Sequence, residues 1–204
     1  MYVHNPYFST SDMNQMFTKA TTNFSVFRLN IHSLAKSFYK LEDFVSTLNK
    51  APSCIAISET WLNSGSAVGK IQLQNYTFIH KPSSTRAGSV GLYIQNCLNY
   101  SACHDIFMPS SNCESLWVKI KTNSSKFIYL VVIYRHPNQQ FDDFERGLNG
   151  LLTKFNLNNN EYIITGDFNI DLLKSTSDNK AGRYYQYLQS CLLRVWNVEN
   201  ILIV

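Results

Sequence analysis

A glycine, a carboxylate, an aromatic ring and an amide follow an apolar segment in the sequence Gly166-Asp167-Phe168-Asn169. Asp167 and Asn169 are two residues apart, so in extended backbone their side chains would point the same way. A carboxylate and an amide at a strand end suit a site for a metal ion or a phosphate. Gly, Asp and Asn are also common turn residues, so a simple turn explains the tetrapeptide equally well.

Polar side chains of similar type stand at the ends of three other apolar segments: Asn30, Glu59 and Tyr134-Arg135-His136. Ligand sites in layered α/β proteins gather at strand ends, because rigid strands hold the loop residues at fixed separations. Mg²⁺ takes one or two carboxylates together with neutral oxygen atoms and water. Glu59 and Asp167 could supply the acids, and Asn30 an uncharged ligand or donor.

The phenol of Tyr134 could donate a hydrogen bond to a phosphate oxygen as negative charge develops there. With the acids, it would suit metal-assisted hydrolysis of a phosphodiester. Each residue also has a structural explanation. Glu59 could be a surface or helix-start acid, Asn30 a cap and Tyr134 a ring at the core edge. His136 precedes a proline in a predicted loop, so we expect it at the surface.

Hydrophobic spacing predicts the elements that must position these residues. Alternating or continuous apolar runs predict strands, and apolar residues at helical spacing predict helices. The predicted strands are 23–30, 51–62, 75–82, 88–96, 113–122, 126–137 and the segment before Gly166, and the predicted helices are 36–50, 140–155 and about 181–193. Helices and strands are mixed without regular alternation, which indicates an α/β protein with a mixed β core.

The composition sets wider limits. The 204 residues suffice for one domain with a hydrophobic core, and the net charge of +4 permits a polyanionic partner without requiring one. No apolar run is long enough to cross a bilayer, and residues 1–22 form a polar segment that we expect to be a flexible extension. Five scattered cysteines and no signal peptide favour an intracellular, non-secreted protein without membrane association.

Six motifs occur in an order and spacing that resemble one family: LNIHSL (29–34), SETWL (58–62), GSVGLYI (88–94), CESLWVKI (113–120), VIYRHPN (132–138) and GDFNIDLL (166–173). They resemble the apurinic-endonuclease-like domain of non-LTR (LINE-type) retrotransposons, in the endonuclease/exonuclease/phosphatase superfamily. The similarity covers residues 24–193. No single motif is decisive, whereas GDFN, SETW and YRHPN together are specific.

The resemblance implies a four-layer α/β sandwich of two packed mixed β-sheets flanked by helices, over residues 23–193. It implies nicking of DNA with Mg²⁺ or Mn²⁺, which would place a functional protein in the nucleus. It implies that Asn30 and Glu59 lie at the metal and that Asp167 orients or activates the attacking water. Asn169 and Tyr134 would hold the scissile phosphate, and Arg135 with the lysines would contact the DNA backbone.

The sequence departs from the family pattern after residue 193. The family has a late strand that ends in Ser-Asp-His, and no such segment occurs here, while residues 194–204 resemble nothing in the family. We therefore expect a fold that lacks the last strands, and weak or no nuclease activity. Two alternatives stay open: a catalytically inactive fold that serves as a binding module or is a transposon relic, and hydrolysis of a lipid phosphodiester instead of DNA.

Overall fold

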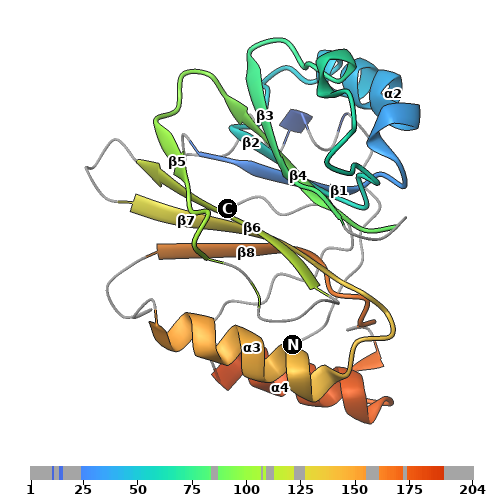
Figure 1. The fold of residues 1–204 in the computed structure, drawn as a ribbon, viewed down its shortest axis with the longest axis vertical. Helices are drawn as coiled ribbons and strands as arrows, with labels where there is room; N and C mark the ends of the chain where they lie inside the picture. The colour runs from blue at the N-terminus through green and yellow to red at the C-terminus, as the bar shows by residue number, and fades with distance from the viewer. Residues whose placement is uncertain are drawn as a thin grey trace.

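Two four-stranded β-sheets form the centre of the protein, which a computed structural model describes over residues 11, 14–15, 24–83, 87–106, 108, 113–121, 127–154, 161–171 and 174–190 (Figure 1). The first sheet has the strand order β1-β2-β4-β3, with β1 (Val26–Asn30), β2 (Cys54–Ser58), β3 (Tyr76–Lys81) and β4 (Val90–Gln95). The second has the order β5-β6-β7-β8, with β5 (Tyr100–Ala102), β6 (Cys113–Lys121), β7 (Phe127–Arg135) and β8 (Glu161–Asp167).

Each sheet contains one parallel pair of strands, and these two pairs position the candidate residues. β1 pairs with β2 in parallel, with Asn30 beside Ser58 at the shared carboxyl end. β7 pairs with β8 in parallel, with Tyr134 beside Asp167. The remaining neighbours in both sheets are antiparallel. The four polar strand ends, which are far apart in the sequence, therefore lie side by side in two pairs, one pair in each sheet.

Alternation of side chains along the strands decides which face each sheet buries. In β7, Leu130 and Val132 face the space between the two sheets, whereas Val131 and Ile133 face the outer helices. β2 divides in the same way, with Cys54 and Ala56 between the sheets and its isoleucines on the outside. Both faces of these strands are buried, which explains why their sequences read as continuous apolar runs.

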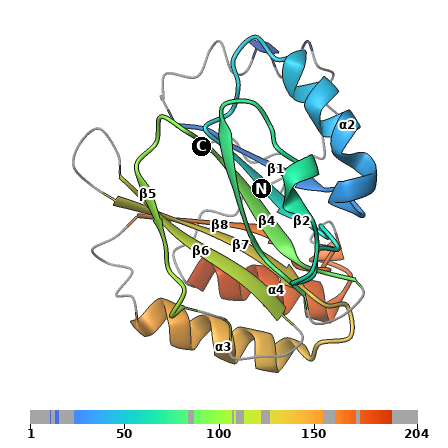
Figure 2. The ribbon, with the colours of Figure 1, turned by 45° about the horizontal axis from the view of Figure 1, so that its top comes forward.

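Helices cover the outer face of each sheet, which gives four layers (Figure 2). Helix α2 (Leu34–Ser46) packs on the first sheet, which also carries the 3-10 turn η1 (Val68–Lys70). Helices α3 (Phe141–Lys154) and α4 (Asn179–Ser190) pack on the second sheet (Figure 1). The apolar residues of α3 recur at helical spacing, so Phe144, Leu148 and Leu152 share one buried face.

This architecture confirms the predicted sandwich of two packed mixed sheets flanked by helices. The three-residue strand β5 and the turn η1 were not predicted, because elements this short leave no periodic signal. Of the predicted extension 1–22, only residues 11, 14 and 15 are described, and Asn14 accepts a hydrogen bond from the Asn49 N–H at 2.8 Å. The predicted tail 194–204 lies outside the described residues. No helix in the described ranges is long and apolar enough to span a bilayer.

Buried acidic protons in this core predict a loss of stability at alkaline pH. Burial raises the pKa of the Cys113 thiol from 9.0 to about 12 and raises the pKa of the Cys54 thiol as well. Burial also raises the pKa of Tyr76 to about 12. Above pH 9 the unfolded chain loses these protons while the folded chain keeps them, so the free energy of unfolding must fall as pH rises towards 12. At pH 10.5 we expect Cys113 alone to contribute about 2 kcal/mol to this loss.

Urea unfolding under reducing conditions at pH 8.0, 9.5 and 10.5 measures this dependence. Cys113→Ala removes one titrating thiol, so its free energy of unfolding should fall less steeply with pH than that of the unmodified protein. Cys97 is exposed, so Cys97→Ala should leave the slope unchanged. Equal slopes for Cys113→Ala and the unmodified protein would contradict the assignment.

Candidate active site

The amide of Asn30 joins the two carboxylates that the sequence singled out. Asn30 Nδ2 donates to Glu59 Oε1 at 2.9 Å and to Asp167 Oδ2 at 2.7 Å. Asn30 ends β1, Glu59 follows β2 and Asp167 ends β8, so the contact crosses from one sheet to the other. Both acids therefore lie within hydrogen-bonding distance of one nitrogen atom, although 108 residues separate them in the sequence.

Basic groups surround this pair of acids on the side of the first sheet. His32 Nδ1 lies 2.7 Å from Glu59 Oε2, and Arg28 Nη2 lies 3.9 Å from Asp167 Oδ2. Sequence reasoning missed both residues. Arg28 lies within the predicted first strand, where a basic residue normally points to solvent, and His32 follows it in a loop. Only their pairing with acids from distant segments identifies them.

Asp167 and Asn169 form a local turn in addition to the site. The Asn169 backbone N–H donates to Asp167 Oδ1 at 2.9 Å, which is the hydrogen bond of an Asx turn. Asn169 has a positive φ of 51°, a conformation that asparagine tolerates better than most residues. Its Nδ2 donates to the Arg135 carbonyl oxygen at 2.6 Å. The turn explanation is confirmed, and the same turn places the Asp167 carboxylate beside Asn30, where the sequence predicted a site.

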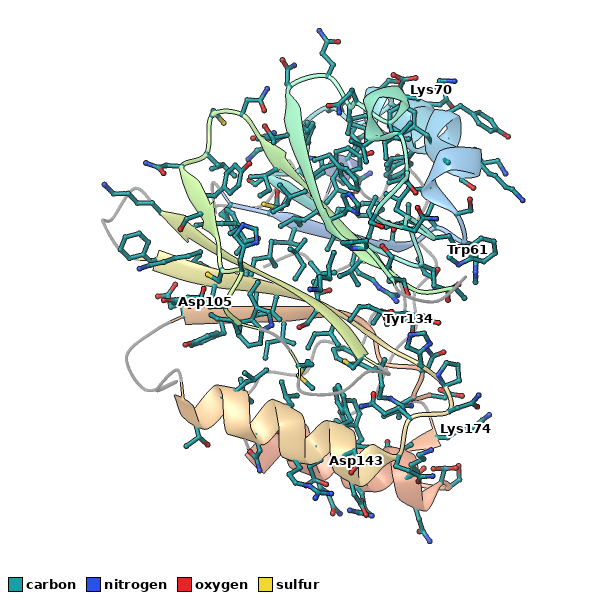
Figure 3. The ribbon with its side chains drawn as sticks, in the orientation of Figure 1. Trp61, Lys70, Asp105, Tyr134, Asp143 and Lys174 are labelled. Atoms are coloured by element: carbon teal, nitrogen blue, oxygen red, sulfur yellow. The ribbon has the colours of Figure 1, made fainter. Side chains whose placement is uncertain are left out.

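The phenol of Tyr134 is held in its protonated form. Its side chain is 4% exposed, and burial raises its pKa to about 12, with the negative charges of Glu59 and Asp167 acting in the same direction. Figure 3 shows Tyr134 at the level where the two sheets meet. A phenol that keeps its proton through neutral and moderately alkaline pH can donate to an anionic oxygen.

Arg135 does not fit its expected role as a DNA contact. Its side chain is 1% exposed, and its guanidinium donates to three backbone carbonyl oxygens. These are Phe168 O at 2.6 Å, Gln139 O at 2.7 Å and Asn169 O at 3.0 Å. Burial also lowers the pKa of Arg135. The expectation is corrected: this arginine fastens the loop after β8 to the loop after β7, and its charge is directed at the backbone of the protein.

His136, which the sequence analysis placed at the surface, is also largely enclosed. Its side chain is 18% exposed, and its Nε2 lies 3.0 Å from Glu114 Oε2. The ring stands edge-on to Tyr134, with centroids 4.9 Å apart. Ser83 Oγ donates to Glu114 Oε1 at 2.6 Å. This buried carboxylate therefore supports the back of the Tyr134 ring through His136, an arrangement that neither residue type indicates alone.

The donor set at the junction fits a hard divalent cation. Two carboxylates held close together repel each other, and a cation between them removes that repulsion. Asn30 Oδ1 is buried and accepts no hydrogen bond in the described part of the chain, so this oxygen could bind a cation. Among the described residues, no group of three or more His, Cys, Asp or Glu could hold a metal. Carboxylate and amide oxygens are the ligand types that Mg²⁺ and Mn²⁺ accept together with water.

No family model matches the sequence, and no curated protein matches it. Solved structures with the same fold do match. The endonuclease domain of TRAS1, a telomere-specific non-LTR retrotransposon, is 14% identical with a TM-score of 0.60 over 82% of this chain and 72% of that one. The AP endonuclease LMAP from Leishmania major is 14% identical with a TM-score of 0.64, over 82% of this chain and 66% of that one.

The 3'-5' exonuclease NExo from Neisseria meningitidis is 10% identical with a TM-score of 0.60, over 82% of this chain and 71% of that one. The chain thus spans roughly two thirds to three quarters of the length of these structures. At such identities the likeness concerns the fold alone, which this chain shares with the TRAS1 endonuclease domain and with AP endonucleases.

Proposed function

We propose that this chain is a divalent-metal-dependent phosphodiesterase that nicks DNA. The observation that carries the proposal is the bridge from Asn30 to Glu59 and Asp167, because it gathers two carboxylates from different sheets at one point. Structural ion pairs do not require two acids to share one neutral donor. A site that must hold a divalent cation beside a phosphate does require a concentration of oxygen ligands.

Glu59 would be the main protein ligand of Mg²⁺ or Mn²⁺. The cation, when bound, would polarise a phosphoryl oxygen and stabilise the charge that develops on it. Asn30 was expected as a second ligand, and its N–H group is directed at the acids. In this arrangement the Asn30 amide nitrogen fixes the separation of Glu59 and Asp167. The Asn30 Oδ1 atom could bind the cation only from the side of the amide that faces away from the two carboxylates.

Asp167 would orient the attacking water and accept its proton. Its two oxygens already accept hydrogen bonds from Asn169 N and from Asn30 Nδ2, which hold the carboxylate in one orientation. Tyr134 would donate its hydroxyl proton in a hydrogen bond to a non-bridging phosphate oxygen, with Asn169 beside it. A donor that is positioned before the reaction stabilises the transition state without reorganisation.

DNA is the proposed substrate because two independent features agree. The motifs of the sequence resemble retrotransposon endonuclease domains, and the fold is shared with the TRAS1 endonuclease domain and with AP endonucleases. The net charge of +4 is compatible with a polyanion. Action on chromosomal DNA would require a nuclear location.

Glu59→Gln and Asp167→Asn should each remove metal-dependent nicking. Each substitution keeps the shape of the side chain and removes one of the two negative charges that attract the cation, so we expect a fall of at least about 100-fold in rate. The assay is conversion of supercoiled plasmid to the open circle with Mg²⁺ or Mn²⁺, together with calorimetric titration of the metal. Asp143→Asn is the matched control, because Asp143 is 60% exposed and pairs with the exposed Arg146.

The outcomes separate the alternatives. Metal binding without nicking, on DNA and on lipid phosphodiesters alike, would indicate a catalytically inactive fold. Turnover of a lipid phosphodiester without nicking of DNA would show that the substrate is a lipid phosphodiester and not DNA. No metal binding by the unmodified protein would overturn the proposal as a whole.

A further inference from the structure

Left-handed backbone is concentrated around Glu59. Non-glycine residues with positive φ include His32 at 45°, Glu59 at 54° and Trp61 at 55°. Such conformations are unfavourable for residues with a side chain and persist only where the surroundings impose them. Here they occur in the two loops that follow β1 and β2, next to the candidate metal ligand. The positive φ values therefore indicate that the surrounding structure holds the side chains of these two loops in fixed positions.

Hydrogen bonds from both sides hold the loop 59–61 in place. From the segment that follows β1, Ser33 N donates to Glu59 O at 2.9 Å and Leu34 N donates to Thr60 O at 3.0 Å. On the other side, Trp61 N donates to Gly88 O at 3.1 Å and Thr60 N donates to Ser89 O at 3.3 Å. The backbone of Trp61 is therefore fixed, even though its side chain is not buried.

The indole of Trp61 is exposed at the candidate site. It is 40% exposed, one of three large hydrophobic side chains that are exposed in the described ranges. The ring of His32 meets it edge-on, with centroids 6.3 Å apart, and the same His32 lies 2.7 Å from Glu59. Figure 3 shows Trp61 and Tyr134 on the same side of the molecule. One histidine thus separates an exposed indole from the proposed metal ligand.

The described residues around Trp61 do not form an apolar docking face. Residues 63–65, which follow it, are exposed Asn, Ser and Gly, and the His32 side chain is 69% exposed. A protein or membrane partner requires a contiguous apolar patch of several hundred Å². A single flat ring beside an imidazole, in a polar loop, suits a small planar ligand instead.

We propose that Trp61, flanked by His32, is a stacking platform for an unpaired nucleobase adjacent to the scissile phosphate. This inference rests on the proposed function and specifies its substrate: DNA in which a base near the nick is unstacked. Every base has a π-face, so such stacking tolerates any sequence, and it contributes about 1–3 kcal/mol per base. Because the loop is already ordered, little conformational freedom of the protein is lost on binding.

Trp61→Ala tests this platform through binding, independently of hydrolysis. Fluorescence anisotropy of a labelled duplex with one central unpaired base, without divalent metal, gives the affinity. A fully paired duplex of the same length is the reference. We expect Trp61→Ala to weaken binding of the unpaired-base duplex about 5- to 150-fold and to affect the paired duplex much less. Trp61→Phe keeps a ring and should restore most of the affinity.

Phe127→Ala is the matched control. Phe127 is 39% exposed, almost the same as Trp61, and begins β7, whereas Tyr134 lies near the other end of that strand. Its loss should leave the affinity for either duplex unchanged. Unchanged binding by Trp61→Ala, or equal losses on both duplexes, would overturn the stacking platform. If the unmodified protein binds neither duplex, the proposed function itself fails, and the platform with it.

Discussion

Replacing Gly166 with alanine is expected to cost at least about 4 kcal/mol of unfolding free energy, which is a large part of the stability of an ordinary domain. A Cβ atom at this position would lie 1.8 Å from the carbonyl oxygen of Ile133, an impossible separation. Gly166 pairs with Ile133 in the parallel ladder of β7 and β8, so the clash involves backbone that cannot rotate away. Gly166 also has a φ of 137°, which L-residues rarely adopt.

The same substitution in a helix provides the control. Gly150 lies in α3, is exposed, and has no atom within 4 Å of the position that a Cβ would occupy. Alanine is the better helix former by about 1 kcal/mol, so Gly150→Ala should stabilise the protein slightly. Urea unfolding of the two variants measures the difference. An unfolding midpoint for Gly166→Ala equal to that of the unmodified protein would contradict the close approach of Gly166 to the Ile133 backbone.

Replacing Arg135 with methionine is expected to have the second largest effect. Methionine fills much of the same volume but leaves three carbonyl oxygens, those of Phe168, Gln139 and Asn169, without their charged donor. Hydrogen bonds to a charged group contribute more than neutral ones, and a buried group left unpaired is costly, so we expect a loss of about 3–5 kcal/mol. Because two of the three carbonyls follow Asp167, the candidate site should loosen as well.

Arg135→Lys separates charge from geometry. A lysine keeps the positive charge but lacks the planar fork that reaches three carbonyls, so we expect it to recover only part of the stability. Arg183→Met is the control at the surface. Arg183 is 59% exposed and pairs with Asp142 and Glu145, so its loss should cost less than about 1 kcal/mol. Equal stability of Arg135→Met and Arg183→Met would refute the structural role of Arg135.

The two glycine positions illustrate what local sequence can reveal. Gly166 sits between an apolar run and an aspartate, where a turn was one of the two explanations that the sequence offered. No local pattern in the sequence indicates that Gly166 pairs with Ile133 in the β7–β8 ladder. Gly150, by contrast, occupies an open helix surface and has no special constraint. Residue type indicates that a constraint can exist, and only the neighbours decide whether it does.

For Arg135, residue type led to the wrong prediction of what surrounds the side chain. An arginine at the end of an apolar strand, next to residues with a chemical role, was expected to face a phosphate. Local sequence does not contain the path of the chain after residue 166, which returns beside residue 135 through the parallel pairing of β7 and β8. That return supplies the carbonyl oxygens of Phe168 and Asn169 and makes burial of the guanidinium favourable.

The sequence by itself determined the elements and the chemistry available at their ends. Period-two runs and helical spacing depend on neighbouring residues only, so they fixed most strands and helices and placed Asn30, Glu59, Tyr134 and Asp167 at strand ends. The tertiary structure alone decided which of these ends meet. Contact between Asn30 and Asp167 requires two separate sheets to pack face to face, and that depends on burial of apolar faces from the whole chain. The pairings of His32 with Glu59 and of Glu114 with His136 depend on the same long-range packing, so no local pattern encodes them.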